Sequence, residues 1–317
     1  MSFQDSTRRK LIPLTAQAKG ATAPLQWDIP KTGLLAAIHV NIAAAVAGSL
    51  SAPNIYGFSS IVRRVRVVTN AGIDLINITG PGYFYLLQNM LEGYQIATPQ
   101  NVGGTAITAI SCNLDMVLPI ALNARDPIGL FMLQNEQTLV QLQVEFEDDA
   151  TVATGATVTA TVTPAIEVFT VPVDTTDWPP LNVVQQTLED TRAITAVGDY
   201  DYSWPRGNTY IQVAHGYGCL ATPAEHWSRA RLIVNQSETL MDYTPGQMAL
   251  EWNRSHGRAR GLGVVLFDLI GTSALGTLGS SRDLMYSAAV TELLSRITIA
   301  AQPHTLRTIR RQLVSLR

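Results

Sequence analysis

The sequence predicts an all-β fold made of two tandem β-sandwiches, each with one short helix. Apolar and polar residues alternate along many segments, only two segments have a helical pattern, and one block of the first half recurs in the second. The chain has 317 residues. That exceeds the usual length of one domain, about 100 to 200 residues, so length and repetition both favour two domains.

The longest expected strand lies within residues 34–46, where Ile38 and Ile42 share one face while His39 and Asn41 lie on the other. A period of two residues is typical of a strand. This segment is apolar enough to resemble a membrane span, but a spanning helix needs about 20 apolar residues without Asn and His. The same alternation predicts strands at 63–69, 138–146, 157–168, 209–214 and 292–300.

Two segments, 81–93 and 245–256, have the pattern of short helices. Each follows a threonine and begins with a Pro/Gly pair, which is typical of a helix N-terminus, and the first ends at Gly93. We expect their apolar residues to cover the open end of each sandwich. These residues are Tyr83, Phe84, Leu86 and Leu87 in the first helix and Met248, Leu250 and Trp252 in the second.

An internal repeat relates the two halves of the chain. The segment VRVVTNAGIDLINITGPGYFYLLQN aligns with ARLIVNQSETLMDYTPGQMALEWN, and both predict strand, turn, strand and helix. At one offset, Arg66 matches Arg231, Asn70 matches Asn235, Leu75 matches Leu240 and Thr79 matches Thr244. At a second, shorter offset, Asp115 matches Asp268 and Thr138 matches Thr291. Between these two matches, Arg125-Asp126 resembles Arg282-Asp283. We infer a duplicated domain.

The proline-flanked stretch VPVDTTDWPPLN marks the boundary between the two copies. About eight strands and one helix per copy fit a jelly-roll sandwich. We therefore expect an N-terminal arm at 1–22, jelly roll 1 at 23–171, a linker at 172–182, and jelly roll 2 at 183–317 with a basic C-terminal strand or tail.

The chain is unusually poor in charge. Charged residues make up 15%, against roughly 25% in an average soluble protein. The net charge of −3 and a pI of about 5.9 give no bulk attraction to nucleic acid, so we expect no sequence-specific nucleic-acid partner. Because hydrophobic residues make up 46%, disorder is excluded. We expect neutral surfaces, or surfaces buried against partners.

Arginines gather at the two ends of the chain and on matching strands. The terminal set is Arg8, Arg9 and Lys10 with Arg307, Arg310, Arg311 and Arg317; it predicts either solvated tails or contacts to an anionic partner. The strand set is Arg63, Arg64 and Arg66 with Arg229 and Arg231; it predicts either acid pairing across an interface or ordinary exposed strand residues.

No pattern for catalysis, for a metal or for a cofactor is found in the sequence. The five histidines form no HExxH or HxH spacing, and neither a GxSxG elbow nor a Walker lysine occurs. His215 and Cys219 are a conceivable Cys/His pair, although a buried thiol beside glycines explains the same residues. We expect Cys112 and Cys219 to be buried free thiols, and no signal peptide is visible. The expectation is a non-enzymatic protein made in the cytoplasm.

The repeated strand-turn-strand-helix block, the two Arg-Asp pairs before alternating strands, and the last strand TIRRQLVSLR resemble the double jelly-roll major capsid proteins of icosahedral viruses. The resemblance covers nearly the whole chain, and its size is similar to that of the compact bacteriophage members. It implies a homotrimer with a pseudo-hexagonal outline that assembles into the shell of the virion. It also implies neighbouring trimers, penton and minor capsid proteins and an internal lipid membrane as partners, with the basic tails pointing inward.

Two other kinds of protein remain open at this point. A carbohydrate-binding β-sandwich, such as a viral spike or a lectin-like module, would expose Trp178, Trp204 and Trp227 together to stack on sugar rings. An enzyme on a duplicated sandwich would need clustered carboxylates, and the candidates 147–149 and 199–201 lie in expected surface turns.

Overall fold

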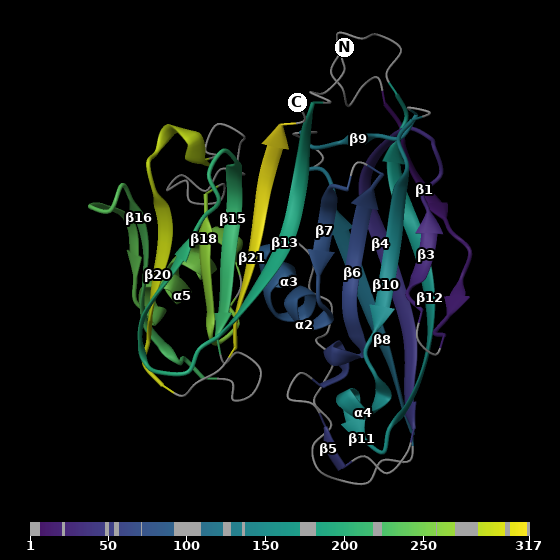
Figure 1. The fold of residues 1–317 in the computed structure, drawn as a ribbon, viewed down its shortest axis with the longest axis horizontal. Helices are drawn as coiled ribbons and strands as arrows, with labels where there is room; N and C mark the ends of the chain where they lie inside the picture. The colour runs from purple at the N-terminus through teal and green to yellow at the C-terminus, as the bar shows by residue number, and fades with distance from the viewer. Residues whose placement is uncertain are drawn as a thin grey trace. The chain divides into compact units, whose positions relative to one another are not determined.

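A computed structural model of the chain divides into two compact units. The first contains Met1–Tyr83, Ile96–Leu188 and Ser315–Arg317, and the second contains Phe84–Gln95 and Glu189–Val314. The residues that the structure describes are 7–20, 23–47, 51–53, 57–70, 72–91, 109–122, 128–134, 137–171, 182–217, 224–257, 259–269, 285–301 and 305–315 (Figure 1). The predicted linker 172–182 lies almost entirely outside them.

One sheet of the first unit is built around the long strand predicted from the alternation. β4 (Leu34–Ala47) lies between β12 (Thr157–Phe169) and β8 (Ala109–Pro119), with antiparallel pairing on both sides. β9 (Phe131–Met132) pairs with the start of β4. Two strands from the predicted N-terminal arm, β1 (Arg9–Pro13) and β2 (Gln17–Ala18), pair with the other edge of β12.

The second sheet of the first unit has the order β3 (Leu25–Asp28), β10 (Val140–Phe146), β6 (Val62–Thr69) and β7 (Asp74–Ile78). Residues Thr187 and Leu188 of β13 (Val183–Ala193) pair in parallel with β7. Alternate residues of β10 and β6 are buried, so each strand turns one face to the core. Shorter elements are β5 (Ser51–Pro53), β11 (Ala153–Thr154), η1 (Gly57–Ile61) and α4 (Asp149–Val152).

The first predicted helix begins one residue early and is not a regular α-helix. The hydroxyl of Thr79 accepts a hydrogen bond from the N–H of Gly82 and caps α2 (Gly80–Gly82). A π-helical turn, η2 (Tyr83–Leu87), follows, and then α3 (Gln88–Met90). From Phe84 onward this helical segment belongs to the second unit.

The second unit repeats the arrangement of the first. Its one sheet has the order β14 (Gly198–Ser203), β20 (Leu293–Ile299), β16 (Trp227–Val234) and β17 (Glu238–Tyr243). In its other sheet β15 (Thr209–Tyr217) lies between β21 (Thr305–Ser315) and β18 (Val264–Asp268), with β19 (Met285–Tyr286) on the start of β15. The 3₁₀ turn η5 (Ser287–Ala289) follows β19.

The predicted helix 245–256 is confirmed with the same bounds as α5 (Pro245–His256). Thr244 forms a capping box with Gln247, and Gly257 ends the helix at a φ of 64°. Met248 belongs to the core cluster of this unit and Trp252 is buried as well, while their covering of the open end of the sandwich stays a prediction. The prediction was wrong for Leu250, whose side chain points outward and is 72% exposed, because a helix at a surface buries one face only.

Strand by strand, the structure reproduces the duplication seen in the sequence. The order β3-β10-β6-β7 of the first unit matches β14-β20-β16-β17 of the second, and β12-β4-β8 matches β21-β15-β18. Matching strands also keep the offsets of the sequence alignment, since β6 and β16 differ by the same number of positions as Thr79 and Thr244. The second Arg-Asp pair and its partner in the first copy lie outside the described residues.

The repeated asparagines hold the same junction in each copy. The Asn70 side chain accepts a hydrogen bond from the N–H of Leu139 (3.3 Å), and the Asn235 side chain accepts one from the N–H of Thr291 (2.8 Å). Their backbone N–H groups donate to Leu139 and Glu292, which are equivalent positions. Each asparagine thus fixes a hairpin turn to the start of the next strand of its sheet.

We expect Asn235→Ala to lower the free energy of unfolding by about 2 kcal/mol, because it removes the hydrogen bonds and places a β-carbon at a left-handed φ. Asn235 has a φ of 50°. In urea titrations, Asn235→Gly should lose about half as much, since glycine tolerates this φ. Equal losses for both variants would contradict the contribution of the backbone conformation.

Candidate assembly surfaces

The basic N-terminal residues lie on the edge strand β1 of the first unit and directly before it. Arg8 and Lys10 are exposed. Arg9 forms an ion pair with Glu167 of β12 at 2.6 Å, and the same carboxylate lies 3.2 Å from Nε2 of His39. Only Arg8 and Lys10 therefore present their charge without a neighbouring acid partner among the described residues.

The arginines of the last strand are paired within the second unit rather than held on a solvated tail. Arg307 pairs with Glu189 at 2.7 Å, and Arg310 pairs with Asp190. Arg310 also donates to the hydroxyl of Tyr202 at 2.7 Å. Burial raises the pKa of Tyr202, so this phenol stays neutral and serves as a hydrogen-bonding group.

Arg311 is nearly inaccessible, with 5% of its surface exposed, and donates to the side-chain oxygen of Gln212 at 2.6 Å. Arg317, the last residue of the predicted terminal set, lies outside the described residues. An inward-facing role for the terminal arginines stays a prediction. The structure shows that the described arginines of β21 already have partners in their own unit.

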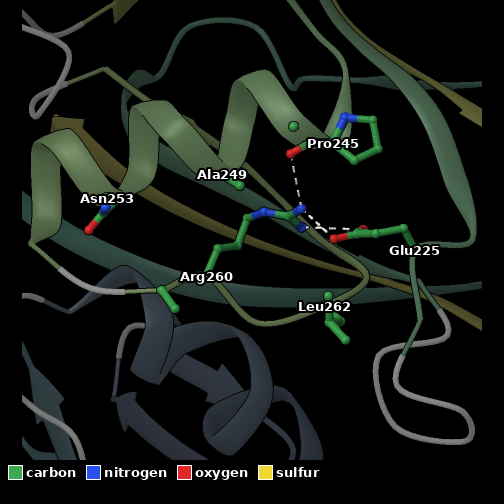
Figure 2. A pocket seen from close by; sticks show the side chains of 8 residues that line it. Glu225, Pro245, Ala249, Asn253, Arg260 and Leu262 are labelled. Carbon is green, nitrogen blue, oxygen red and sulfur yellow. Dashed lines mark hydrogen bonds and ion pairs between the residues drawn. The ribbon is translucent and has the colours of Figure 1, made fainter.

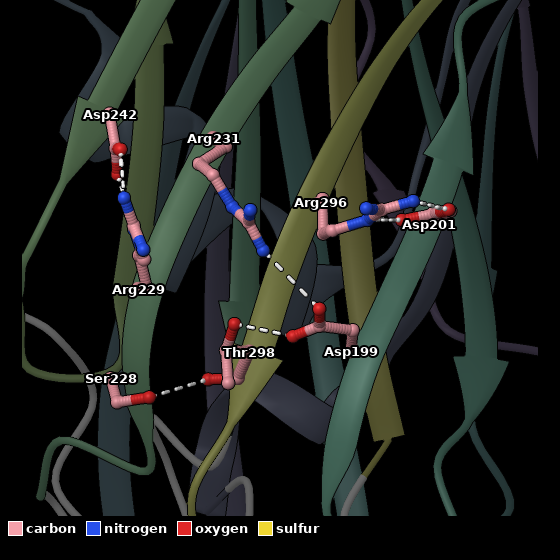
Figure 3. Close-up of polar contacts among 8 residues, drawn as sticks. All are labelled: Asp199, Asp201, Ser228, Arg229, Arg231, Asp242, Arg296 and Thr298. Atoms are coloured by element: carbon pink, nitrogen blue, oxygen red, sulfur yellow. Dashed lines mark hydrogen bonds and ion pairs between the residues drawn. The ribbon is translucent and has the colours of Figure 1, made fainter. Parts of the chain in front are cut away.

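The predicted interface arginines are largely neutralised by acids on neighbouring strands. Figure 3 shows an exposed ladder of ion pairs across β14, β20, β16 and β17, which we call the charge ladder. Its pairs are Arg229 with Asp242, Arg231 with Asp199, and Arg296 with Asp201. Arg296 makes two hydrogen bonds to Asp201, at 2.6 and 2.7 Å, and these hold the pKa of Asp201 below its usual value.

The charge ladder should contribute little to stability, because solvent screens exposed pairs. We expect Arg296→Ala to lower the free energy of unfolding by at most about 1 kcal/mol, and by less in molar salt. Arg206→Ala, an exposed arginine in a turn, is the matched control. If Arg296→Ala lost much more free energy of unfolding than Arg206→Ala, and the loss did not depend on salt, the small contribution expected of the charge ladder would be wrong.

A β-bulge sets apart two arginines of the first unit. Phe146 faces Val62 while Glu145 faces Arg64, so Arg63 is the extra residue on β6. Arg63 and Arg64 are both exposed, whereas Arg66 pairs with Asp74 at 3.0 Å.

The second unit has a bulge at the equivalent position of β16, where the extra residue is Ser228. Its hydroxyl lies against the carbonyl of Thr298, and the next residue, Arg229, is part of the charge ladder (Figure 3). The duplicated bulge thus presents two exposed arginines without an acid partner among the described residues in one copy, and a paired arginine in the other. The alternation of β6 predicted the exposed arginines, but a bulge has no local sequence signal.

A groove of about 460 Å³ lies beside α5 in the second unit (Figure 2). Its walls come from Pro245, Gly246, Ala249 and Asn253 of the helix and from Ala259 and Leu262 of the following loop. At its base the buried guanidinium of Arg260 is paired with Glu225 and donates to the carbonyl of Pro245. The groove is therefore largely apolar, and the two charges at its base, those of Arg260 and Glu225, cancel each other.

The two candidate tryptophans that the structure describes are buried, which disfavours the carbohydrate-binding alternative. Trp204 and Trp227 are each 2% exposed and lie in the core of the second unit. Trp204 packs edge-on against Tyr210, with ring centroids 4.8 Å apart, and donates to the hydroxyl of Ser295. Trp178 lies outside the described residues. Stacking on sugars needs exposed rings, and neither of these two tryptophans provides one.

The candidate Cys/His pair is not formed by described residues, since Cys219 lies outside them. His215 is fully buried, with Nδ1 2.8 Å from the hydroxyl of Thr308 and Nε2 2.7 Å from that of Ser295. Burial lowers the pKa of His215 to about 3. Cys112 is a half-buried free thiol, and burial raises its pKa to about 11. At neutral pH the Cys112 thiol is therefore protonated, and both ring nitrogens of His215 are engaged by buried hydroxyl groups.

The described part of the chain contains no group of three or more His, Cys, Asp or Glu side chains arranged to hold a metal ion. Within the same residues, no helix is both long and apolar enough to cross a membrane. The apolar segment that resembled a membrane span is β4.

Neither a protein-family model nor a curated protein matches the sequence. Solved structures do match. The STIV major capsid protein, from the Sulfolobus Turreted Icosahedral Virus, is 12% identical with a TM-score of 0.76, and 97% of each chain is covered. The PBCV-1 virus capsid gives a TM-score of 0.65 at 10% identity, covering 98% of this chain and 95% of the other.

The major capsid protein P2 of bacteriophage PM2 is also similar, with a TM-score of 0.59 at 10% identity and 98% of each chain covered. At such identities the similarity concerns the fold. It extends over both units and agrees with the strand orders of the two duplicated sandwiches. The chain has the double jelly-roll fold of the major capsid proteins of icosahedral viruses.

Proposed function

We propose that this chain is a viral major capsid protein that assembles as pseudo-hexameric trimers into an icosahedral shell. The observation that carries the proposal is the coverage of nearly the entire chain by the fold of viral capsid proteins. Two similar sandwiches in one chain give six in a trimer. One gene product then presents six nearly equivalent edges to its neighbours.

The chemistry of the surfaces supports a role in assembly. Only 15% of the residues are charged, and the charge ladder neutralises most of the charge on the exposed sheet of the second unit. Burying an ion against a partner costs several kcal/mol if it is unpaired. Surfaces without free charges avoid this cost when subunits pack together.

The proposed partners are further copies of the chain, penton and minor capsid proteins, and a lipid membrane beneath the shell. The exposed Arg8 and Lys10 are the residues best placed to meet anionic lipid or other anionic groups, since the described arginines of β21 are paired. The protein would act in the virion, after synthesis in the host cytoplasm. It would act by assembly, without catalysis and without a cofactor.

The test is the mass of the purified protein in solution, measured by light scattering over a range of concentrations. We expect a stable species near three times 34.3 kDa, together with larger shells as the concentration rises. A strict monomer at all concentrations, with no particles in electron micrographs, would contradict the proposal.

A further inference from the structure

One sheet of the second unit is buried on both faces. β21, β15 and β18 turn one face to the core, yet Gln212, Ala214, Leu266 and Ile309 on the opposite face are buried as well. A sheet face at the surface of a sandwich normally exposes alternate residues. Another segment of the chain therefore covers this outer face.

The helical segment after Tyr83 lies on that face. It belongs to the second unit, and the side-chain amide of Gln212 donates to the carbonyl of Met90 at 3.3 Å. Phe84, Gln88 and Met90 are all buried. The segment comes from the first copy of the repeat, so within one chain the helix of copy one contacts the outer sheet face of copy two.

The equivalent sheet face of the first unit is open. Asn41 lies opposite Asp115 and Thr163, as Gln212 lies opposite Asp268 and Arg311, so the two registers correspond. We call the surface formed by Asn41, Ala43, Asn113, Thr161 and Thr163 the open face. All five residues are exposed, uncharged and short.

The helix α5, which is equivalent to the covering segment, is also exposed on one side. In α5, Met248 and Trp252 are buried, but Ala249 and Asn253 are exposed and line the groove of Figure 2. At the offset of the repeat, these two exposed residues match Phe84 and Gln88, which are buried in copy one. The chain therefore makes this helix-to-sheet contact once. The second possible contact of the same kind is not made, because the exposed side of α5 and the open face both lack a partner among the described residues.

We propose that the groove beside α5 of one copy receives the open face of a second copy of this chain. This proposal rests on the proposed function and specifies the contact between subunits. The two surfaces differ, so the contact is head-to-tail, and such contacts close into a ring when the rotation permits. A ring of three chains would then contain six successive helix-to-sheet contacts of one kind.

The chemistry of the two surfaces fits a second copy as the occupant. The groove carries no unpaired charge, because Arg260 at its base is neutralised by Glu225. Beside the open face, the carboxylate of Asp115 accepts a hydrogen bond from the side-chain amide of Asn41. The covered face inside the chain is apolar at Leu266 and Ile309, whereas the open face has Asn113 and Thr161 at the equivalent positions. A polar, uncharged face keeps the free subunit soluble and still packs closely.

The test uses two single variants, Ala43→Arg on the open face and Ala249→Arg in the groove. Both residues are exposed, so we expect the fold and the melting temperature to be unchanged. Gln26→Arg is the matched control on an exposed strand position of the other sheet of the first unit. Mass is measured by light scattering for each variant alone and for the two mixed in equal amounts.

Each variant alone should be monomeric, while wild type and Gln26→Arg form trimers. The mixture should form a dimer near twice 34.3 kDa, because only one intact groove and one intact open face remain in each pair. Trimers of both single variants, a mixture that stays monomeric, or dissociation of Gln26→Arg would each overturn the proposed contact while leaving the capsid role intact. A monomeric wild type would instead contradict the capsid role itself.

Discussion

Replacing Gly80 with alanine is expected to lower the free energy of unfolding by about 3 kcal/mol, because the new β-carbon has no room. An ideal Cβ at Gly80 would lie 2.1 Å from the carbonyl oxygen of Ser59 and 2.7 Å from that of Val62. Both obstacles are backbone atoms, at the end of η1 and the start of β6. The helix start and β6 would have to separate for the methyl group to fit.

The equivalent helix supplies a control for this substitution. At the offset of the repeat Gly80 matches Pro245, and the next residue of α5, Gly246, is a glycine whose added Cβ would meet nothing within 4 Å. Gly246→Ala should therefore be neutral or stabilise by up to about 1 kcal/mol, since alanine restricts the unfolded chain more than glycine. Urea titrations of both variants give the comparison. Similar losses at the two positions would contradict the close packing deduced for Gly80.

Lowering the pH from 6.5 to 4 is expected to cost the second jelly roll roughly 3 kcal/mol through His215 alone, at about 1.4 kcal/mol per pH unit. The pKa of His215 falls from an unfolded value of 6.5 to about 3 because the ring is buried. Between these values the unfolded chain binds a proton that the folded chain does not. Stability is therefore fully present above pH 6.5 and is lost as the pH falls towards 3.

Urea unfolding at several pH values, followed by the fluorescence of the buried Trp204 and Trp227, measures this dependence. His215→Gln should be less stable at pH 7, since it disturbs the bonds to Ser295 and Thr308, but it should show a flatter dependence between pH 6.5 and 4. An unchanged slope in His215→Gln would contradict the assignment.

Asp201 and Asp242 do not contribute to the loss of stability between pH 6.5 and 4. Hydrogen bonds from Arg296 and Arg229 hold the pKa of each carboxyl below the usual 3.8. A depressed carboxyl pKa gives stability that is present above 3.8 and lost only as the pH falls further. Acid unfolding should therefore proceed in two ranges, first through His215 and then through the aspartates.

Local sequence patterns predicted the strands and α5 because these depend on neighbours in the chain. The alternation at 34–46 predicted β4, and the Thr-Pro-Gly start predicted α5 with its bounds. The π-helical turn at Tyr83–Leu87 and the bulge at Arg63 were not predicted. Both arise from how an element packs against distant parts of the chain, which a local pattern does not record.

The candidate assembly surfaces were only partly predictable for the same reason. The sequence identified Arg307 and Arg310 as a basic terminal group, but their partners Glu189 and Asp190 lie far away in sequence and meet them only in the folded unit. The repeat matched α5 to the first helix without showing that one is buried and the other open. That Ala249 is exposed while its equivalent, Phe84, is buried follows only from the folded structure.

The most direct test of the account is electron microscopy of the purified, unassembled species in negative stain. If two jelly rolls per chain act as six equivalent units in a trimer, face-on class averages should show a hexagonal outline with six lobes. The mass of the same particles should be near three times 34.3 kDa. Particles with another number of lobes, or isolated two-lobed monomers, would contradict the account.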